Sequence, residues 1–266
     1  MKILAFDVGG TKISYALAND KGRLLTAVTT VPTPQNSAAI TQIFAAAAQE
    51  NKADALAIAT AGVVFRNRVL GKPNNLPLDY DKINFAKVTG LPCLIENDAN
   101  AAAWAEHKIG ALKNMAHAVM LTLGTGVGCG IICNNRLLYG KTGAAGEVTF
   151  PLAGCDLAKF AEQNGIYEND CFKIYEMVKQ HQPAALKAYE EWQREMIDAL
   201  VCINRLLDVE AVAFSGSLAQ IVNYAHVEAA VNQRTYRNPL KVVPACCGSS
   251  AGLVGAALLY GEKDRD

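Results

Sequence analysis

The sequence predicts an α/β protein built from two similar domains. Segments of strand character alternate with segments of helical character along the chain, and this alternation is typical of α/β layers. The order of elements then restarts near residue 113, where a strand and a second glycine-rich turn follow each other as they do near the N-terminus. Such a restart predicts two domains of one plan with a cleft between them. The halves share this plan without an obvious sequence repeat.

The first half begins with three predicted strands, at residues 3–8, 12–18 and 24–31. A helix is expected from about Ser37 to Gln49, with Asn36 or Ser37 as its N-cap. The continuous apolar run DALAIATAG is typical of a strand buried on both faces. The rest of this half predicts a hairpin in VVFRNRVLG, an irregular segment in KPNNLPLDY, a strand in LPCLIEND and a helix in ANAAAWAEHK.

The second half opens with HAVMLTLGTG, a predicted strand that ends in glycines. VGCGIICNNRLLYG predicts two strands joined by an Asn-Asn turn. Helices are expected at about 155–164, 168–180 and 184–207, with Pro183 marking a break. AVAFSGS predicts a strand, a glycine turn and then a helix. LKVVPACC predicts a last strand, and SSAGLVGAALLYG predicts a closing helix whose small residues allow tight packing.

Composition excludes several classes of protein. The 266 residues are 51% hydrophobic and 19% charged, which fits a globular protein rather than a disordered one. The formal net charge of +0 provides no field that favours nucleic acid or an anionic membrane. The apolar runs are interrupted before they reach the length of a bilayer span, and no leader pattern precedes the first strand, so a cytoplasmic protein is expected. The eight cysteines contain no CxxC pair and are interpreted as reduced core thiols.

Two glycine turns are candidates for binding phosphate. The first follows Asp7, an acid at the end of a strand, and comprises Gly9, Gly10, Thr11 and Lys12; the second comprises Gly124, Thr125, Gly126, Val127, Gly128 and Gly130. Glycine lets backbone N–H groups approach an anion closely, and two such turns facing each other would suit a polyphosphate. Neither turn matches a Walker A loop or a dinucleotide fingerprint. Glycines that merely form tight turns are the alternative.

Two acids are candidate functional residues. Asp7 repels phosphate but can hold Mg²⁺ through water, since this ion keeps most of its waters and needs only one or two carboxylates. Asp98, in ENDAN, lies at the junction of a strand and a helix. A carboxylate there can accept the proton of an attacking hydroxyl. Aspartate is also a good N-cap, and spacing alone favours that structural role.

Four motifs resemble those of one family. FDVGGTKISYAL, IENDANAAAWAE, LGTGVGCGII and GAAGE stand in the order found in the ROK sugar kinases (repressor, open reading frame, kinase), and the resemblance covers nearly the whole chain. It implies a two-domain actin-like ATPase (ribonuclease H-like) fold with a cleft between the domains. The first domain would comprise residues 1–112 and the C-terminal helix at about 250–266, and the second residues 113–249.

The resemblance also implies an activity. It is the transfer of the γ-phosphoryl group of ATP, with Mg²⁺, to a sugar hydroxyl, most simply the 6-position of a glucose-like hexose. A homodimer is a family expectation, and neither nucleic acid nor a membrane is an expected partner. The implied roles are phosphate binding by both glycine turns, adenosine binding by Gly216 and Ser217, catalytic base for Asp98, and sugar binding by Asn75, Asn97, Asp98 and Glu147. Ordinary loop chemistry is the alternative for Asn75, and a solvated loop acid for Glu147.

The sequence departs from the family at one segment. Phe150 occupies the position of a histidine that helps to hold the sugar, and the cysteine-rich zinc segment that follows in the family is absent. Cys155 alone cannot form a four-ligand site, so no structural zinc is expected. Losing the histidine removes a hydrogen-bond donor, which leaves the identity of the sugar open.

Other functions remain possible. The sugar could be N-acetylmannosamine or fructose. A degenerate actin-like protein that binds nucleotide without kinase activity is a second possibility. A sugar-responsive regulator is a third, and is disfavoured because the chain starts at the first strand without a helix-turn-helix domain.

Overall fold

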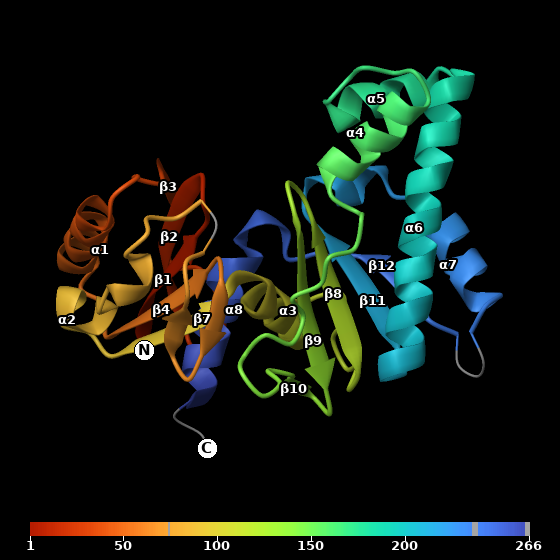
Figure 1. Ribbon diagram of the computed structural model, residues 1–266. Helices are drawn as coiled ribbons and strands as arrows, with labels where there is room; N and C mark the ends of the chain where they lie inside the picture. The colour runs from red at the N-terminus through yellow and green to blue at the C-terminus, as the bar shows by residue number, and fades with distance from the viewer. Residues whose placement is uncertain (74, 236–238, 264–266) are drawn as a thin grey trace. The chain divides into compact units, whose positions relative to one another are not determined.

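The computed structural model describes residues 1–73, 75–235 and 239–263, which divide into two compact units (Figure 1). Unit 1 comprises Met1–Ile109, Leu137–Ala145 and Cys247–Asp266, and unit 2 comprises Gly110–Arg136 and Gly146–Cys246. Asn74 of the NNLP segment and residues 264–266 of the expected C-terminal helix lie outside the described residues.

Unit 1 is built on a mixed sheet whose central strand is the first in the chain. Its order is β3-β2-β1-β4-β7. β1 (Lys2–Val8) pairs antiparallel with β2 (Lys12–Asn19), which pairs antiparallel with β3 (Thr29–Pro32). On its other side β1 pairs in parallel with β4 (Ala55–Thr60), which pairs in parallel with β7 (Cys93–Asn97).

The two faces of this sheet are covered differently. The remaining elements of unit 1 are α1 (Ser37–Asn51), β5 (Val63–Phe65), β6 (Arg68–Leu70), η1 (Tyr80–Lys82), α2 (Phe85–Thr89), α3 (Asp98–Ile109), η3 (Gly248–Ser250) and α8 (Ala251–Lys263). On one face, Phe44 of α1 stacks on Phe6 of β1 with ring centroids 3.8 Å apart, and α2 joins the same core (Figure 1). On the other face alanines of β1 and β4 pack against α3 and α8, so these helices lie close to the strands.

Unit 2 repeats the plan with the strand order β10-β9-β8-β11-β12. Its strands are β8 (Ala118–Leu123), β9 (Val127–Cys133), β10 (Arg136–Leu137), β11 (Ala211–Ser215) and β12 (Lys241–Pro244); β8 is antiparallel to β9 and parallel to β11. Its helical elements are α4 (Gly154–Gln163), α5 (Cys171–Lys179), α6 (Pro183–Leu207), η2 (Ser217–Ile221) and α7 (Tyr224–Asn232). The predicted α/β fold class and the shared plan are therefore confirmed.

Local predictions differ from the structure in a few places. The third strand is shorter than predicted, because Leu24 forms only an isolated bridge with Ala18 before β3 begins. Helix α5 begins three residues later than predicted, because Asp170 caps it by accepting from the N–H of Phe172. The chain after β11 first forms the 3₁₀ helix η2, and α2 was not predicted at all. Three of the cysteines interpreted as core thiols are exposed: Cys155, Cys202 and Cys246.

Within the described ranges, no helix combines the length and the apolar character needed to cross a membrane.

Helices α3 and α8 pack closely at Gly255, where a Cβ atom would clash with the carbonyl of Ala101. We predict that Gly255→Ala lowers the melting temperature by several degrees, because overpacking costs about 1–3 kcal/mol. Helix propensity alone predicts the opposite sign, a gain of about 1 kcal/mol. Ala46→Gly at an exposed position of α1 measures that propensity effect in the same unit. Thermal unfolding of Gly255→Ala at or above the wild-type temperature would contradict the close contact.

Candidate functional site

The register of the unit 1 sheet brings two acids into one row. Asp7 of β1 lies opposite Ala59 of β4, and Ala59 lies opposite Glu96 of β7. Neighbours in one row of a pleated sheet project from the same face, so Asp7 and Glu96 flank the small Ala59. Since β1, β4 and β7 are parallel, this row lies where all three strands end, the edge at which open α/β sheets bind ligands.

Asp7 lies beneath the start of α8. A Cβ atom on Gly252 would stand 2.7 Å from its carboxylate oxygen Oδ2, so glycine there permits the approach. The pKa of Asp7 is raised to about 7, mainly by desolvation and also by the nearby charge of Asp98, whereas the charge of Lys12 lowers it. Two predicted site acids are thus close in unit 1. Sequence reasoning missed Gly252, although the small residues of the closing helix were a signal for tight packing.

The strand-to-helix junction after β7 divides two roles between neighbouring residues. The side chain of Asn97 accepts from the N–H of Asn100 at 3.0 Å and donates to the carbonyl of Gly62 at 3.0 Å. Asn97 therefore caps α3, and Asp98 is the first helical residue, with Oδ1 accepting from the N–H of Ala99 at 2.8 Å. The capping role considered for Asp98 belongs to Asn97. The sugar contact of Asn97 stays a prediction, for which its amide retains a second N–H.

The first glycine turn is held on both sides. The N–H of Gly9 donates to the carbonyl of Lys12 at 3.0 Å, and the hydroxyl of Thr33 donates to the carbonyl of Gly9 at 2.6 Å. A Cβ atom on Gly10 would clash with the side chain of Asn75. Unit 1 therefore brings this predicted phosphate turn directly against a predicted sugar-binding residue.

The second glycine turn, in unit 2, has open space around it. The N–H of Gly124 donates to the carbonyl of Gly126 at 3.0 Å, and Thr125 between them is exposed. A Cβ atom on Gly124 or Gly126 would have nothing within 4 Å. Neither glycine has a positive φ, so neither backbone conformation nor packing within the described chain requires glycine here. A ligand that must come close to the backbone would explain both.

The predicted adenosine residues lie beside this turn. Strand β11 pairs with β8 so that Ser215 lies opposite Thr122, two residues before Gly124. Gly216 follows with φ +86° and packs so closely on the carbonyl of Leu123 that a side chain would clash with it. The parallel register of unit 2 therefore places Gly216 and Ser217 next to the second turn.

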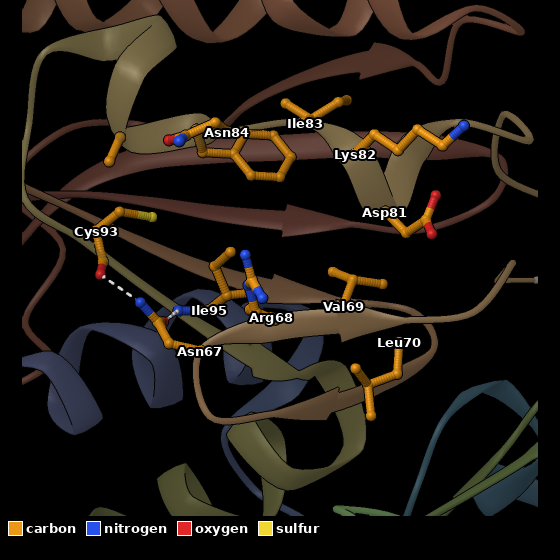
Figure 2. Close-up of a pocket in the computed structure, with 12 residues that line it drawn as sticks. Asn67, Arg68, Val69, Leu70, Asp81, Lys82, Ile83, Asn84, Cys93 and Ile95 are labelled. Carbon is orange, nitrogen blue, oxygen red and sulfur yellow. Dashed lines mark hydrogen bonds between the residues drawn. The ribbon is translucent and has the colours of Figure 1, made fainter.

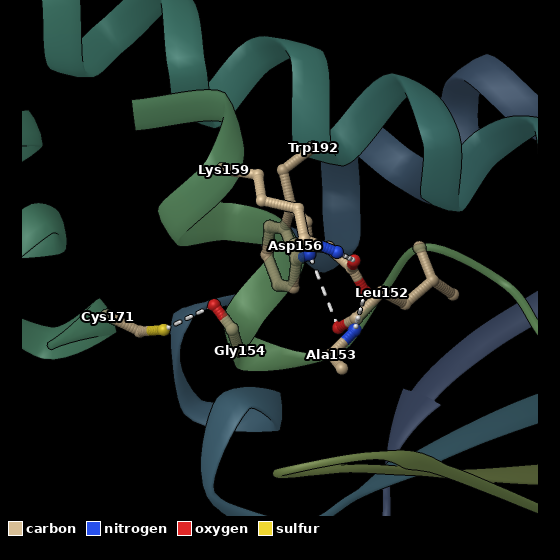
Figure 3. Close-up of polar contacts among 7 residues, drawn as sticks. All are labelled: Leu152, Ala153, Gly154, Asp156, Lys159, Cys171 and Trp192. Carbon is tan, nitrogen blue, oxygen red and sulfur yellow. Dashed lines mark hydrogen bonds and ion pairs between the residues drawn. The ribbon is translucent and has the colours of Figure 1, made fainter. Parts of the chain in front are cut away.

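The segment at the start of α4 contacts the second glycine turn and is itself held by hydrogen bonds within unit 2 (Figure 3). The N–H of Gly154 donates to the carbonyl of Gly124 at 2.9 Å. The indole N–H of Trp192 in α6 donates to the carbonyl of Leu152 at 3.3 Å, and the thiol of Cys171 donates to the carbonyl of Gly154 at 3.1 Å. These contacts connect the turn to the helical layer of unit 2.

The segment that departs from the family lies just before these contacts. Glu147 is exposed. Burial is the main cause that raises the pKa of the Cys129 thiol, and the nearby charge of Glu147 raises it as well. Phe150 is half-buried. Cys155 is exposed and, among the residues that the structure describes, belongs to no group of three metal-binding side chains.

A cavity of about 440 Å³ in unit 1 lies apart from these residues, between β6, η1, α2 and β7 (Figure 2). None of the predicted site residues lines it. The amide of Asn67 closes the free edge of β7 there, donating to the carbonyl of Cys93 at 3.0 Å and accepting from the N–H of Ile95 at 2.6 Å. These two bonds complete the edge of the sheet.

Comparisons with known proteins agree with the fold and the motifs. The profile described as the ROK family matches residues 3–165 and 151–263. A curated relative, the N-acetylmannosamine kinase of Yersinia pestis, is 31% identical over 97% of each chain. Among solved structures, the ROK hexokinase of Thermus thermophilus is 27% identical with a TM-score of 0.85 over 100% of each chain. A ROK glucokinase of Streptomyces griseus, in complex with glucose and AMPPNP, is 26% identical with a TM-score of 0.75 over 97% of this chain and 99% of that one.

These matches span nearly the whole chain, and the solved neighbours have the actin-like ATPase fold. The resemblance carried by the four motifs is confirmed, and its named relatives are sugar kinases. The protein belongs to the ROK family.

Proposed function

We propose that the protein is an ATP-dependent kinase that phosphorylates a hydroxyl of a hexose-type sugar. The observation that carries the proposal is the proximity of Asp98 to Asp7 at the ends of the parallel strands, with the first glycine turn directly after β1. A base, a metal-binding acid and a phosphate turn are the parts that phosphoryl transfer requires. The sugar kinases among the relatives support the same reaction.

In this proposal Asp98 accepts the proton of the attacking hydroxyl. The sugar oxygen forms a bond to the γ-phosphorus, the bond between that phosphorus and the β–γ bridging oxygen breaks, and ADP leaves. The N-terminus of α3 stabilises the ionised form of Asp98, which keeps it ready to accept the proton. The second N–H of Asn97, together with Asn75 and Glu147, would hold the sugar hydroxyls.

The two glycine turns would hold the phosphates, and Gly216 and Ser217 the adenosine. The charges of Asp7 and Asp98 repel each other, which fits a site completed by a divalent cation. Asp7 would hold Mg²⁺ through water, and the ion when bound would neutralise phosphate charge.

Two observations bear on which sugar is the substrate. The curated relative at 31% identity is named for N-acetylmannosamine, whereas the glucokinase is 26% identical. Half-buried Phe150 offers an apolar surface, which suits an acetamido methyl group better than a hydroxyl. N-acetylmannosamine is therefore the first candidate and glucose the second.

A coupled ADP-release assay with N-acetylmannosamine, glucose, mannose and fructose tests the proposal. Sugar-stimulated ADP formation is expected with at least one of them. Nucleotide binding without stimulation by any sugar would instead favour a degenerate nucleotide-binding protein.

We predict that Asp98→Asn keeps nucleotide affinity but lowers kcat by about 10²–10⁴-fold, because the amide cannot accept the hydroxyl proton. Steady-state kinetics with the best sugar measures the loss. Asp81→Asn is the matched control, since it removes an exposed carboxylate from η1 of the same unit. A wild-type rate for Asp98→Asn would reject Asp98 as the base.

We predict that Asp7→Asn raises the melting temperature at pH 8 in the absence of nucleotide. The pKa of Asp7 is raised in the folded state to about 7 from 3.8, so folding takes up a proton between these values. The resulting stability is present at low pH and is lost as pH rises through this window. The variant, which does not ionise, should gain over wild type as pH rises and should differ least near pH 4. A pH-independent difference would show that Asp7 does not titrate in this way.

We predict that the purified protein holds no structural zinc. Cys155 is the one cysteine in the segment where the family places its zinc ligands, and one cysteine cannot form a four-ligand site. Elemental analysis after dialysis without chelator measures the content. One tightly held zinc per chain would overturn this prediction.

A further inference from the structure

Glu96, a buried acid next to the catalytic motif, has no role in the mechanism above. Its side chain is 5% exposed and accepts three hydrogen bonds. Oε1 accepts from the N–H of Asn97 at 2.8 Å and from the amide of Asn100 at 3.1 Å. Oε2 accepts from the hydroxyl of Tyr139 at 2.8 Å. Burial raises the pKa of Glu96, and these bonds, which favour the charged form, oppose that rise.

The partner hydroxyl comes from a distant part of the chain. Tyr139 lies in the segment Leu137–Ala145, which groups with unit 1 although the chain before and after it belongs to unit 2. The segment is a closed loop, since the N–H of Ala145 donates to the carbonyl of Tyr139 at 3.2 Å. It packs tightly on β5, where a Cβ atom on Gly143 would lie 2.5 Å from the carbonyl oxygen of Val64. The loop that carries Tyr139 to Glu96 is therefore held in place by its own packing on β5.

The position of Glu96 makes these bonds relevant to Asp98. Oε1 holds the last residue of β7, Asn97, and a residue of the first turn of α3, Asn100. Asp98 lies between Asn97 and Asn100 along the chain. The N–H of Asn100 is in turn held by the side chain of Asn97, so the junction is a closed network. The hydroxyl of Tyr139 holds the other oxygen of the carboxylate on which this network is built.

We propose that Glu96 and Tyr139 are a positioning pair that holds Asp98 in the orientation needed for proton transfer. The proposal rests on the proposed kinase function. In this proposal each residue acts through the backbone and side chains of the junction. Misplacing a catalytic group by about 1 Å can cost about 10²-fold in rate, so a lost orienting bond has a measurable effect on kcat.

The test compares Tyr139→Phe, Glu96→Gln and the double variant with wild type. Tyr139 is 36% exposed, and Tyr139→Phe keeps its ring and removes only the hydroxyl. Thr26→Val is the matched control: it removes a hydroxyl that accepts one hydrogen bond, from the N–H of Leu17, toward the other end of β2 from the glycine turn. Each variant is measured for kcat, for KM of sugar and nucleotide, and for amide hydrogen exchange at Ala99 and Asn100.

The expected result for Tyr139→Phe is a fall in kcat of about tenfold or more, with both KM values within about twofold of wild type. Exchange at Asn100 should become faster, and the double variant should be no slower than the worse single variant, because the two residues act as one unit. Thr26→Val should change neither kcat nor exchange in α3.

Two results would overturn the proposal. One is a kcat for Tyr139→Phe that equals that of Thr26→Val. The other is exchange in α3 that is unchanged in Tyr139→Phe, which would show that the junction does not depend on this bond. Absence of any sugar-stimulated turnover in wild type would instead contradict the proposed function. The exchange measurement would still decide whether Glu96 and Tyr139 order the junction between β7 and α3.

Discussion

The arrangement of the unit 1 site depends on the parallel register of β1, β4 and β7. This register sets Asp7 and Glu96 in one row, on either side of the small Ala59. The same row ends beside α3, so Asp98 joins it from the first turn of a helix. A shift of one residue in either pairing would send the acids to the opposite face, where Phe6 and Phe44 form the aromatic core.

Close helix packing turns this row into a desolvated site. Alanines on the strands and Gly252 of α8 let this helix lie near the sheet, where Gly252 packs against Asp7, and Gly255 lets α8 pack against Ala101 of α3. Burial of a carboxylate is unfavourable unless hydrogen bonds or opposite charges compensate it. Burial raises the pKa of both acids, but Glu96 accepts three hydrogen bonds, whereas Asp7 has the like charge of Asp98 nearby.

Sequence reasoning predicted what depends on local patterns. Alternating elements, the restart in the second half and the four motifs led to the fold class and the family, because strand and helix periodicity is local and motif order is visible in the chain. It considered only Asp98 as the cap of α3, whereas in the structure Asn97 is the cap, and the tertiary contact of Asn97 with Gly62 is not visible in the sequence. Nor could it find the bond between Glu96 and Tyr139, which joins residues far apart in the chain. Gly124 and Gly126 show the reverse case, since their openness in the structure strengthens a prediction made from sequence.

The central claim is that Asp98 receives the proton of a sugar hydroxyl while the first glycine turn holds the transferred phosphate. A crystal structure with a non-hydrolysable ATP analogue, Mg²⁺ and the best sugar tests it most directly. The account predicts a sugar hydroxyl within about 3 Å of the Asp98 carboxylate, and the γ-phosphate of the analogue against Gly10 and Thr11. A sugar bound away from Asp98, or a phosphate chain that contacts neither glycine turn, would contradict it.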